Sequence, residues 1–249
     1  MPLTDMPLSI VHLSTGVLLA ATLAGSACAP APDPQVARAA RAAADERAAE
    51  AMAAEFDQAI AQRNWSLAGA HGDVLIAEYP DSAAAARVGA QHGEVKAKAV
   101  AAAEARRVAA LWSYQTQAVD GGEQRSAAVQ ARDRVDVDGS GAKVVRLIFR
   151  DHPGWGRSSY LVLEAGDFDC YGGCRVQVAV DDAAAKAMAA SRPKTDEAIA
   201  MFIKDERALW RLAKDAEVIA IEFPVKAGGT RTAVFEVGGL DETRLPGWN

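Results

Sequence analysis

Residues 160–182, YLVLEAGDFDCYGGCRVQVAVDD, decide the fold of the C-terminal part of this chain. Within Arg175–Val180 a valine stands at every second position, which is the pattern of a half-buried strand. An apolar run at 159–164 precedes it, and Gly172-Gly173 is a turn signal between the two runs. The stretch therefore predicts two strands of an antiparallel sheet.

Similar short β-type runs occur on both sides of this stretch, and glycine- or proline-containing turn signals separate several of them. An amphipathic pattern over 196–215 predicts a helix among the strands. We expect residues 111–249 to form an antiparallel β-sandwich-like domain with about seven strands and one or two packed helices. The further runs lie at 111–119, 125–131, 143–150, 218–223 and 230–237.

The preceding part, residues 35–110, is predicted to be helical. Residues 35–56 are mostly alanine with charged residues, which favours a solvated helix over a coiled coil because alanine is too small for a deep seam. A break at Arg63-Asn64 and an N-cap at Asp81-Ser82 predict two further helices. Residues 59–88 resemble a tetratricopeptide-type hairpin, although only about one and a half units are visible. The expected fold class is thus α+β.

The N-terminus has the pattern of a bacterial export signal. Residues 6–32 contain no charged side chain, and an apolar run at 16–24 precedes the small residues 25–27 and then Cys28. This order resembles a lipoprotein signal, which implies a signal peptide over 1–27, an acylated thiol (a palmitate-type anchor) at Cys28 and a proline-broken tether over 28–34. Cleavage after Ala27 to give a soluble secreted protein, and a retained membrane helix, are the alternatives.

Composition limits the partners and the compartment. The net charge of −6 would become −5 after loss of residues 1–27, and a mildly acidic chain argues against a nucleic-acid partner. With Cys28 lipidated, Cys170 and Cys174 remain as an even pair that should close in an oxidising periplasm. We expect a structural disulfide. A redox switch is the alternative, but thioredoxin-type centres place two residues between the thiols.

Other candidate chemistry is weak. His152 is the only histidine near the cysteines, so a zinc site lacks a second ligand pair. The acids around the cysteines, at 167, 169, 181 and 182, fit solvated turns better than a calcium loop. The chain has neither a nucleophile elbow nor a phosphate-binding glycine loop, so we predict no enzyme activity and no cofactor or metal.

Gly154-Trp155-Gly156-Arg157 is the candidate recognition loop. Trp155 between two glycines in a turn can be exposed, and tryptophan and arginine dominate binding hot spots. The alternative is that the indole folds back onto the sandwich. Three tryptophans in patterned segments are expected in the core, at positions 65, 112 and 210.

Residues 110–249 also resemble a known group. The order VVRLIFR (144–150), the stretch 160–182 and TAVFEVGGLDETRLPGW (232–248) resembles uncharacterised proteobacterial envelope lipoproteins. The Phe-x-x-x-Gly-Leu-Asp element at 235–241 is similar to the end of type VI secretion accessory proteins of the VasI/TagO kind. The resemblance implies an envelope protein with a protein partner of unknown identity, and Ala29 resembles the sorting pattern for the outer membrane.

We therefore expect a non-enzymatic, lipid-anchored binding or scaffolding module that faces the periplasm. The alternatives are a type VI secretion accessory protein and, third, a periplasmic hydrolase or thiol sensor.

Overall fold

The computed structural model of this chain describes residues 33–194 and 199–248. The predicted signal peptide and the predicted acylation site Cys28 lie outside the described residues, as do the first residues of the predicted 196–215 helix. By its contacts the chain divides into two units, residues 1–45 and 46–249. No helix in the described part of the chain is both long enough and apolar enough to span a membrane.

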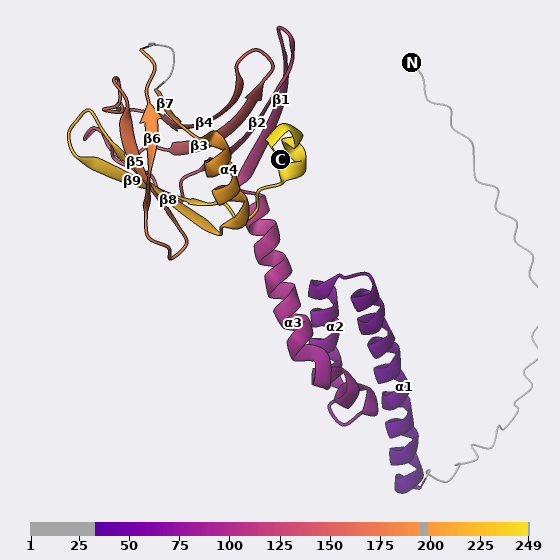
Figure 1. Cartoon of the computed structure of the whole chain (residues 1–249). Coiled ribbons are helices and arrows are strands. Elements are labelled where there is room, and N and C mark those ends of the chain that lie inside the picture. The colour runs from indigo at the N-terminus through magenta and orange to yellow at the C-terminus, as the bar shows by residue number, and fades with distance from the viewer. Residues whose placement is uncertain (1–32, 195–198, 249) are drawn as a thin grey trace, which may run out of the picture. The chain divides into compact units, whose positions relative to one another are not determined.

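Three helices come first: α1 (Pro34–Ala61), α2 (Trp65–Glu78) and α3 (Ala83–Ala109) (Figure 1). The side chain of Asn64 accepts the N–H of Leu67 at 3.3 Å, and Ser82 Oγ accepts the N–H of Ala85 at 3.0 Å. These caps satisfy backbone donors that the first helical turns leave without partners. The helices therefore begin where the sequence places them.

A small core joins the second half of α1 to α2 and α3. Ala49, Ala53 and Phe56 are fully buried there, together with Leu75 and Val88. The prediction of a solvated helix over 35–56 was wrong for the part of this range that lies in the second half of α1. There the small alanine side chains let neighbouring helices approach closely enough to exclude water.

The strands of the remaining described residues form one sheet of nine, and every neighbouring pair is antiparallel. The strand order is β1-β2-β3-β4-β7-β6-β5-β8-β9. The strands are β1 (Trp112–Val119), β2 (Gly122–Gln130), β3 (Val145–His152), β4 (Gly156–Leu163), β5 (Cys174–Val180), β6 (Lys186–Ser191), β7 (Ala200–Ile203), β8 (Val218–Pro224) and β9 (Thr230–Glu236).

The prediction of a β-sandwich-like domain with about seven strands missed two strands. It also missed that all the strands belong to a single continuous sheet. β6 and β7 connect β4 to β5, so strands that a sandwich would divide between two sheets belong to one sheet. The sequence hides β6 because half of KAMAAS is alanine and its first residue is lysine, and both residue types are depleted in strands.

The predicted helix over 196–215 was wrong in its first part. Met201 and Ile203 alternate into the core as part of β7, and α4 (Glu206–Asp215) begins only after Asp205. Asp205 has a positive φ of 57°, and its side chain accepts the N–H of Ala208 at 3.1 Å. This cap starts the helix directly after a strand.

The inner faces of the strands share one core with α4 and the C-terminal end, where the turns η1 (Glu242–Arg244) and η2 (Pro246–Trp248) lie. Leu245 between the two turns and Trp248 of η2 belong to this core. Phe149 lies at its centre, with its ring edge-on to Trp210 at 5.2 Å and to Trp248 at 5.4 Å between centroids. Figure 1 shows α4 and the C-terminal turns near β1–β4. Arg132 N donates to Val234 O at 2.7 Å, so the sheet curls until the end of β2 reaches β9.

Candidate functional site

The outer face of β1–β4, which points away from the core, is the candidate binding surface. Cross-strand register aligns Gln115, Ser126, Arg150 and Ser158 in one row over the four strands. The next row contains Tyr160 on β4. Because side chains alternate along a strand, these residues share one face, which we call the outer face.

A hollow of about 410 Å³ lies on the outer face. Its polar lining offers hydroxyl, amide, phenol and guanidinium groups, and none of its lining residues carries a carboxylate. The polar lining residues are Ser113, Gln115, Gln124, Ser126, Gln130, Arg146 and Tyr160. The volume falls within the range of small-ligand sites.

Trp155 extends the outer face at the β3–β4 turn. Its indole is 73% exposed and stacks on the His152 ring, with centroids 4.0 Å apart and an interplanar angle of 14°. His152 Nδ1 accepts the N–H groups of Gly154 (3.0 Å) and Trp155 (3.2 Å), so the ring proton is on Nε2. The turn thus holds an exposed aromatic surface in one orientation.

Arg150 connects this turn to the sheet. Its guanidinium carbon is 5.2 Å from the Trp155 ring centroid and 5.3 Å from that of Tyr160, within cation–π range of both. Arg150 Nε and the neighbouring Ser158 Oγ are shielded from solvent and have no hydrogen-bond partner within the described chain. Two adjacent polar atoms without partners are uncommon inside proteins and are typical of sites that meet a ligand or water.

The charge of the outer face is positive. Burial raises the pKa of Tyr160, while the nearby charges of Arg150 and Arg146 lower it and only partly offset the effect of burial. Both guanidinium charges therefore interact electrostatically with the Tyr160 phenol. The outer face favours ligand groups that accept hydrogen bonds or carry negative charge.

The structure separates the two residues of the predicted recognition loop. Trp155 is exposed, as the recognition hypothesis requires, and does not fold back onto the sheet. Arg157 pairs across the strands with Asp151, which places it on the opposite face from Arg150 and Ser158. A Cβ on Gly247 would lie 2.3 Å from Asp151 Oδ2, so the C-terminal turn covers this region. Arg150, which sequence reasoning did not select, takes the place predicted for Arg157.

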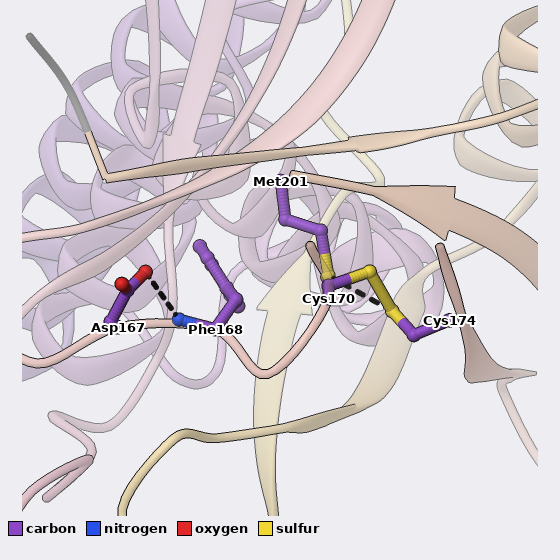
Figure 2. Close-up of a disulfide and its surroundings, with 5 residues drawn as sticks. All are labelled: Asp167, Phe168, Cys170, Cys174 and Met201. Carbon is purple, nitrogen blue, oxygen red and sulfur yellow. Dashed lines mark hydrogen bonds between the residues drawn. A yellow bond between two sulfur atoms is a disulfide. The ribbon is translucent and has the colours of Figure 1, made fainter. Parts of the chain in front are cut away.

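Cys170 and Cys174 form a disulfide, with their Cα atoms 5.0 Å apart (Figure 2). Cys170 is buried, and Cys174 Sγ lies 3.7 Å from the sulfur of Met201, as Figure 2 shows. Closing such a short loop stabilises the fold by about 2 kcal/mol in the chain-entropy account. The pair joins the loop to the start of β5.

A buried ion pair lies beside the disulfide loop. Arg192 is 6% exposed, its Nε donates to Asp167 Oδ1, and its backbone N–H donates to Cys170 O at 3.0 Å. Tyr171 Oη donates to Asp167 Oδ2 at 2.9 Å. Burial opposes ionisation of Asp167, but the hydrogen bonds from Arg192 and Tyr171 and the charge of Arg192 outweigh it, so its pKa is lowered.

The predicted turn acids do not gather at one place. Asp181 Oδ1 accepts the N–H groups of Glu217 (3.1 Å) and Val218 (2.8 Å), while Asp167 is held by Arg192. Within residues 33–194 and 199–248, no three histidine, cysteine, aspartate or glutamate side chains form a metal-binding group.

Of the three tryptophans expected in the core, Trp112 and Trp210 are buried. Trp65 is only partly buried, and the ammonium of Lys98 lies 4.9 Å from its ring centroid. Sequence reasoning did not assign Trp248 to the core, where it is 3% exposed. The apolar pattern near it is short, so periodicity gave no signal there.

The C-terminal Phe-x-x-x-Gly-Leu-Asp element has packing roles. Phe235 is fully buried, and a Cβ on Gly239 would lie 2.3 Å from the backbone nitrogen of Ala109. The backbone N–H of Asp241 donates to Tyr114 Oη at 2.7 Å, and the Asp241 side chain caps η1. The fold thus accounts for these residue types without a ligand.

Comparison with known proteins gives no assignment: no family model, curated protein or solved structure matches the chain significantly.

Proposed function

We propose that this chain is a non-enzymatic binding module of a bacterial cell envelope, anchored by lipid on Cys28. It faces the periplasm from the outer membrane and holds an envelope protein partner on its outer face. The export-signal pattern of residues 1–27 supports the location. A disulfide between the two remaining cysteines is consistent with an oxidising compartment.

One observation supports the binding role most directly: the sheet presents a cationic and aromatic surface whose side chains are already oriented by contacts with one another. Trp155 stacks on His152, and the Arg150 guanidinium is within cation–π range of both the Trp155 and the Tyr160 rings. Tryptophan, tyrosine and arginine are the residue types that dominate binding hot spots, and their fixed orientation lowers the entropic cost of association. The partner surface that complements this face is acidic.

The helical part supplies a second element of the proposed scaffold, a tetratricopeptide-like hairpin of α2 and α3. His92 Nε2 lies 3.2 Å from Gly69 O, and Lys96 Nζ donates to Asp73 at 3.1 Å, so the two helices pack side by side. Gly72 lies at the contact, where a Cβ would be 2.5 Å from the His92 ring. Small residues at helix contacts are typical of such hairpins.

Photocrosslinking in intact cells tests the proposal. A photoreactive phenylalanine analogue replaces Gln115, which faces outward, or its neighbour Thr116, whose exposed side chain points to the opposite face. We expect a defined crosslinked product from position 115, absent from position 116 and strongly reduced by Arg150→Gln. Arg134→Gln, which removes the same charge at an exposed position outside the hollow, serves as the control. Equal products from both positions, or yields unaffected by Arg150→Gln, would contradict the proposal.

A second candidate function is that of an accessory protein in type VI secretion, and it rests on the element at 235–241. Because this element has packing roles here, the resemblance supports a shared C-terminal architecture more than a shared partner. Sheath and spike genes beside the gene for this chain would favour the secretion role, and their absence would argue against it.

A further inference from the structure

A second hollow, about 320 Å³ in volume, lies between α4 and the C-terminal turns. Arg207, Trp210, Arg211 and Lys214 line one side of it, and their spacing of three and four residues places them on one face of the helix. Glu242 of η1 and Trp248 of η2 line the other side. We call this feature the α4 hollow. It is separate from the outer face.

Two buried indole N–H groups belong to residues that line the α4 hollow. Trp210 is 1% exposed and Trp248 is 3% exposed, with ring centroids 5.1 Å apart. Neither Nε1 has an acceptor within the described residues. Trp112 of the same core differs, because its Nε1 donates to Val237 O at 3.3 Å. A buried donor without an acceptor is energetically costly, so two such donors on neighbouring rings favour a ligand that only accepts hydrogen bonds.

The charge around the α4 hollow also favours a ligand that accepts hydrogen bonds, because it is mainly positive. Its lining carries three cationic side chains and one carboxylate. Glu242 lies 3.7 Å from Lys214, which leaves the two arginines without an ion-pair partner in the described chain. Guanidinium groups recognise oxyanions through paired N–H donors. Donors and charge therefore both select an anion.

We propose that the α4 hollow binds an oxyanion, either a phosphate or a carboxylate group of a small ligand. Arg207 and Arg211 hold its charge, and the indole N–H groups of Trp210 and Trp248 donate to its oxygens. This site does not depend on the outer-face proposal, and each can fail without the other.

Indole N–H resonances of the isotope-labelled full chain test the site. The five tryptophans give five such signals, and single Trp→Phe variants assign them. The chain is titrated with sodium phosphate and, separately, with sodium acetate, while sodium chloride keeps the ionic strength constant. We expect at least one of the two anions to shift the signals of Trp210 and Trp248 in a saturable way, while the Trp112 signal stays fixed. The more effective anion identifies the ligand group.

Arginine variants test the site by their anion affinity, even if a tryptophan variant fails to fold. Arg207→Gln and Arg211→Gln, both at exposed positions, should each weaken binding about tenfold or more, because a charge-assisted hydrogen bond is worth about 1.5–3 kcal/mol. Arg134→Gln removes the same charge elsewhere and should leave the affinity unchanged. The proposal is overturned if neither anion shifts the two signals, or if chloride shifts them equally. It is also overturned if Arg207→Gln and Arg211→Gln both bind the anion as tightly as the native chain and the Arg134→Gln control do.

Discussion

The indole of Trp155 lies flat on the imidazole of His152, with the ring centroids 4.0 Å apart. The same imidazole accepts the backbone N–H groups of Gly154 and Trp155 through Nδ1. One side chain therefore fixes both the backbone of the β3–β4 turn and the aromatic surface that the turn exposes. Such pre-ordering lowers the entropy lost when a partner binds.

Replacement of His152 by alanine should release this turn. The amide protons of Gly154 and Trp155 lose their acceptor, so we expect them to exchange with solvent faster, with global stability lowered by only about 1 kcal/mol. Residue-resolved hydrogen exchange measures the effect. His71→Ala, which removes a histidine from α2, should leave the turn protected. Unchanged exchange at Trp155 in His152→Ala would show that the turn does not need the ring.

Removal of the charge of Arg150 should change the titration of Tyr160. Burial raises the pKa of this phenol, and the positive charges of Arg150 and Arg146 oppose that increase by stabilising the phenolate. Arg150→Gln removes one of these charges, so the pKa of Tyr160 should rise further. Carbon-13 chemical shifts of the tyrosine rings follow this titration. A lowered pKa would mean that Arg150 does not face the phenol.

The ion pair of Asp167 and Arg192 should contribute to acid sensitivity. The folded chain has a lowered pKa at Asp167, so its contribution to stability is complete above the ordinary aspartate pKa of about 3.9 and is lost as the pH falls through the folded value. Urea unfolding at a series of pH values should show a shallower acid loss of stability in Asp167→Asn than in the native chain. At neutral pH the same variant should be less stable, because Arg192 keeps its buried charge without a carboxylate. Identical pH slopes in the two proteins would refute this role.

Gly239 and Gly89 should respond in opposite ways to the same substitution. A Cβ on Gly239 would meet the backbone of Val108 and Ala109 at 2.3–2.5 Å, so Gly239→Ala should destabilise the fold by about 1–3 kcal/mol. Gly89 lies within α3 with open space around its Cα, so Gly89→Ala should stabilise it by about 0.5–1 kcal/mol. Thermal unfolding measures the stability of both variants. Equal changes in stability would contradict the close packing of Gly239 against the end of α3.

Local patterns were enough to predict much of the fold from the sequence. The breaks at Asn64 and Ser82 and the alternation in β5 are signals within a few residues, and the structure has the helix starts and the strand there. β6 and β7 depend instead on pairing that joins them between β4 and β5. KAMAAS of β6 shows no strand pattern, and AMFI of β7 is an apolar run too short for periodicity to distinguish a strand from a helix. The joining of all strands into one sheet is such a long-range property.

The candidate site was predictable only in part. Trp155 was found because its flanking glycines indicate an exposed turn. Arg150 was not, since within VVRLIFR it looks like any polar end of a strand. A signal was present in the alternation: Arg146, Ile148 and Arg150 share one face, while Val145, Leu147 and Phe149 point into the core. Only the cross-strand register shows that the arginine face meets Tyr160 and Trp155.

Radioactive or clickable fatty acid supplied to the native host tests most directly whether the chain is a lipid-anchored envelope protein. We expect the label to enter the native chain and to be absent from Cys28→Ala. We also expect the mass of the mature protein to be that of a lipid-modified chain that starts at residue 28 and has one disulfide, between Cys170 and Cys174. An uncut, unlabelled chain with free thiols in the cytosol would contradict the proposed anchor, compartment and partner together.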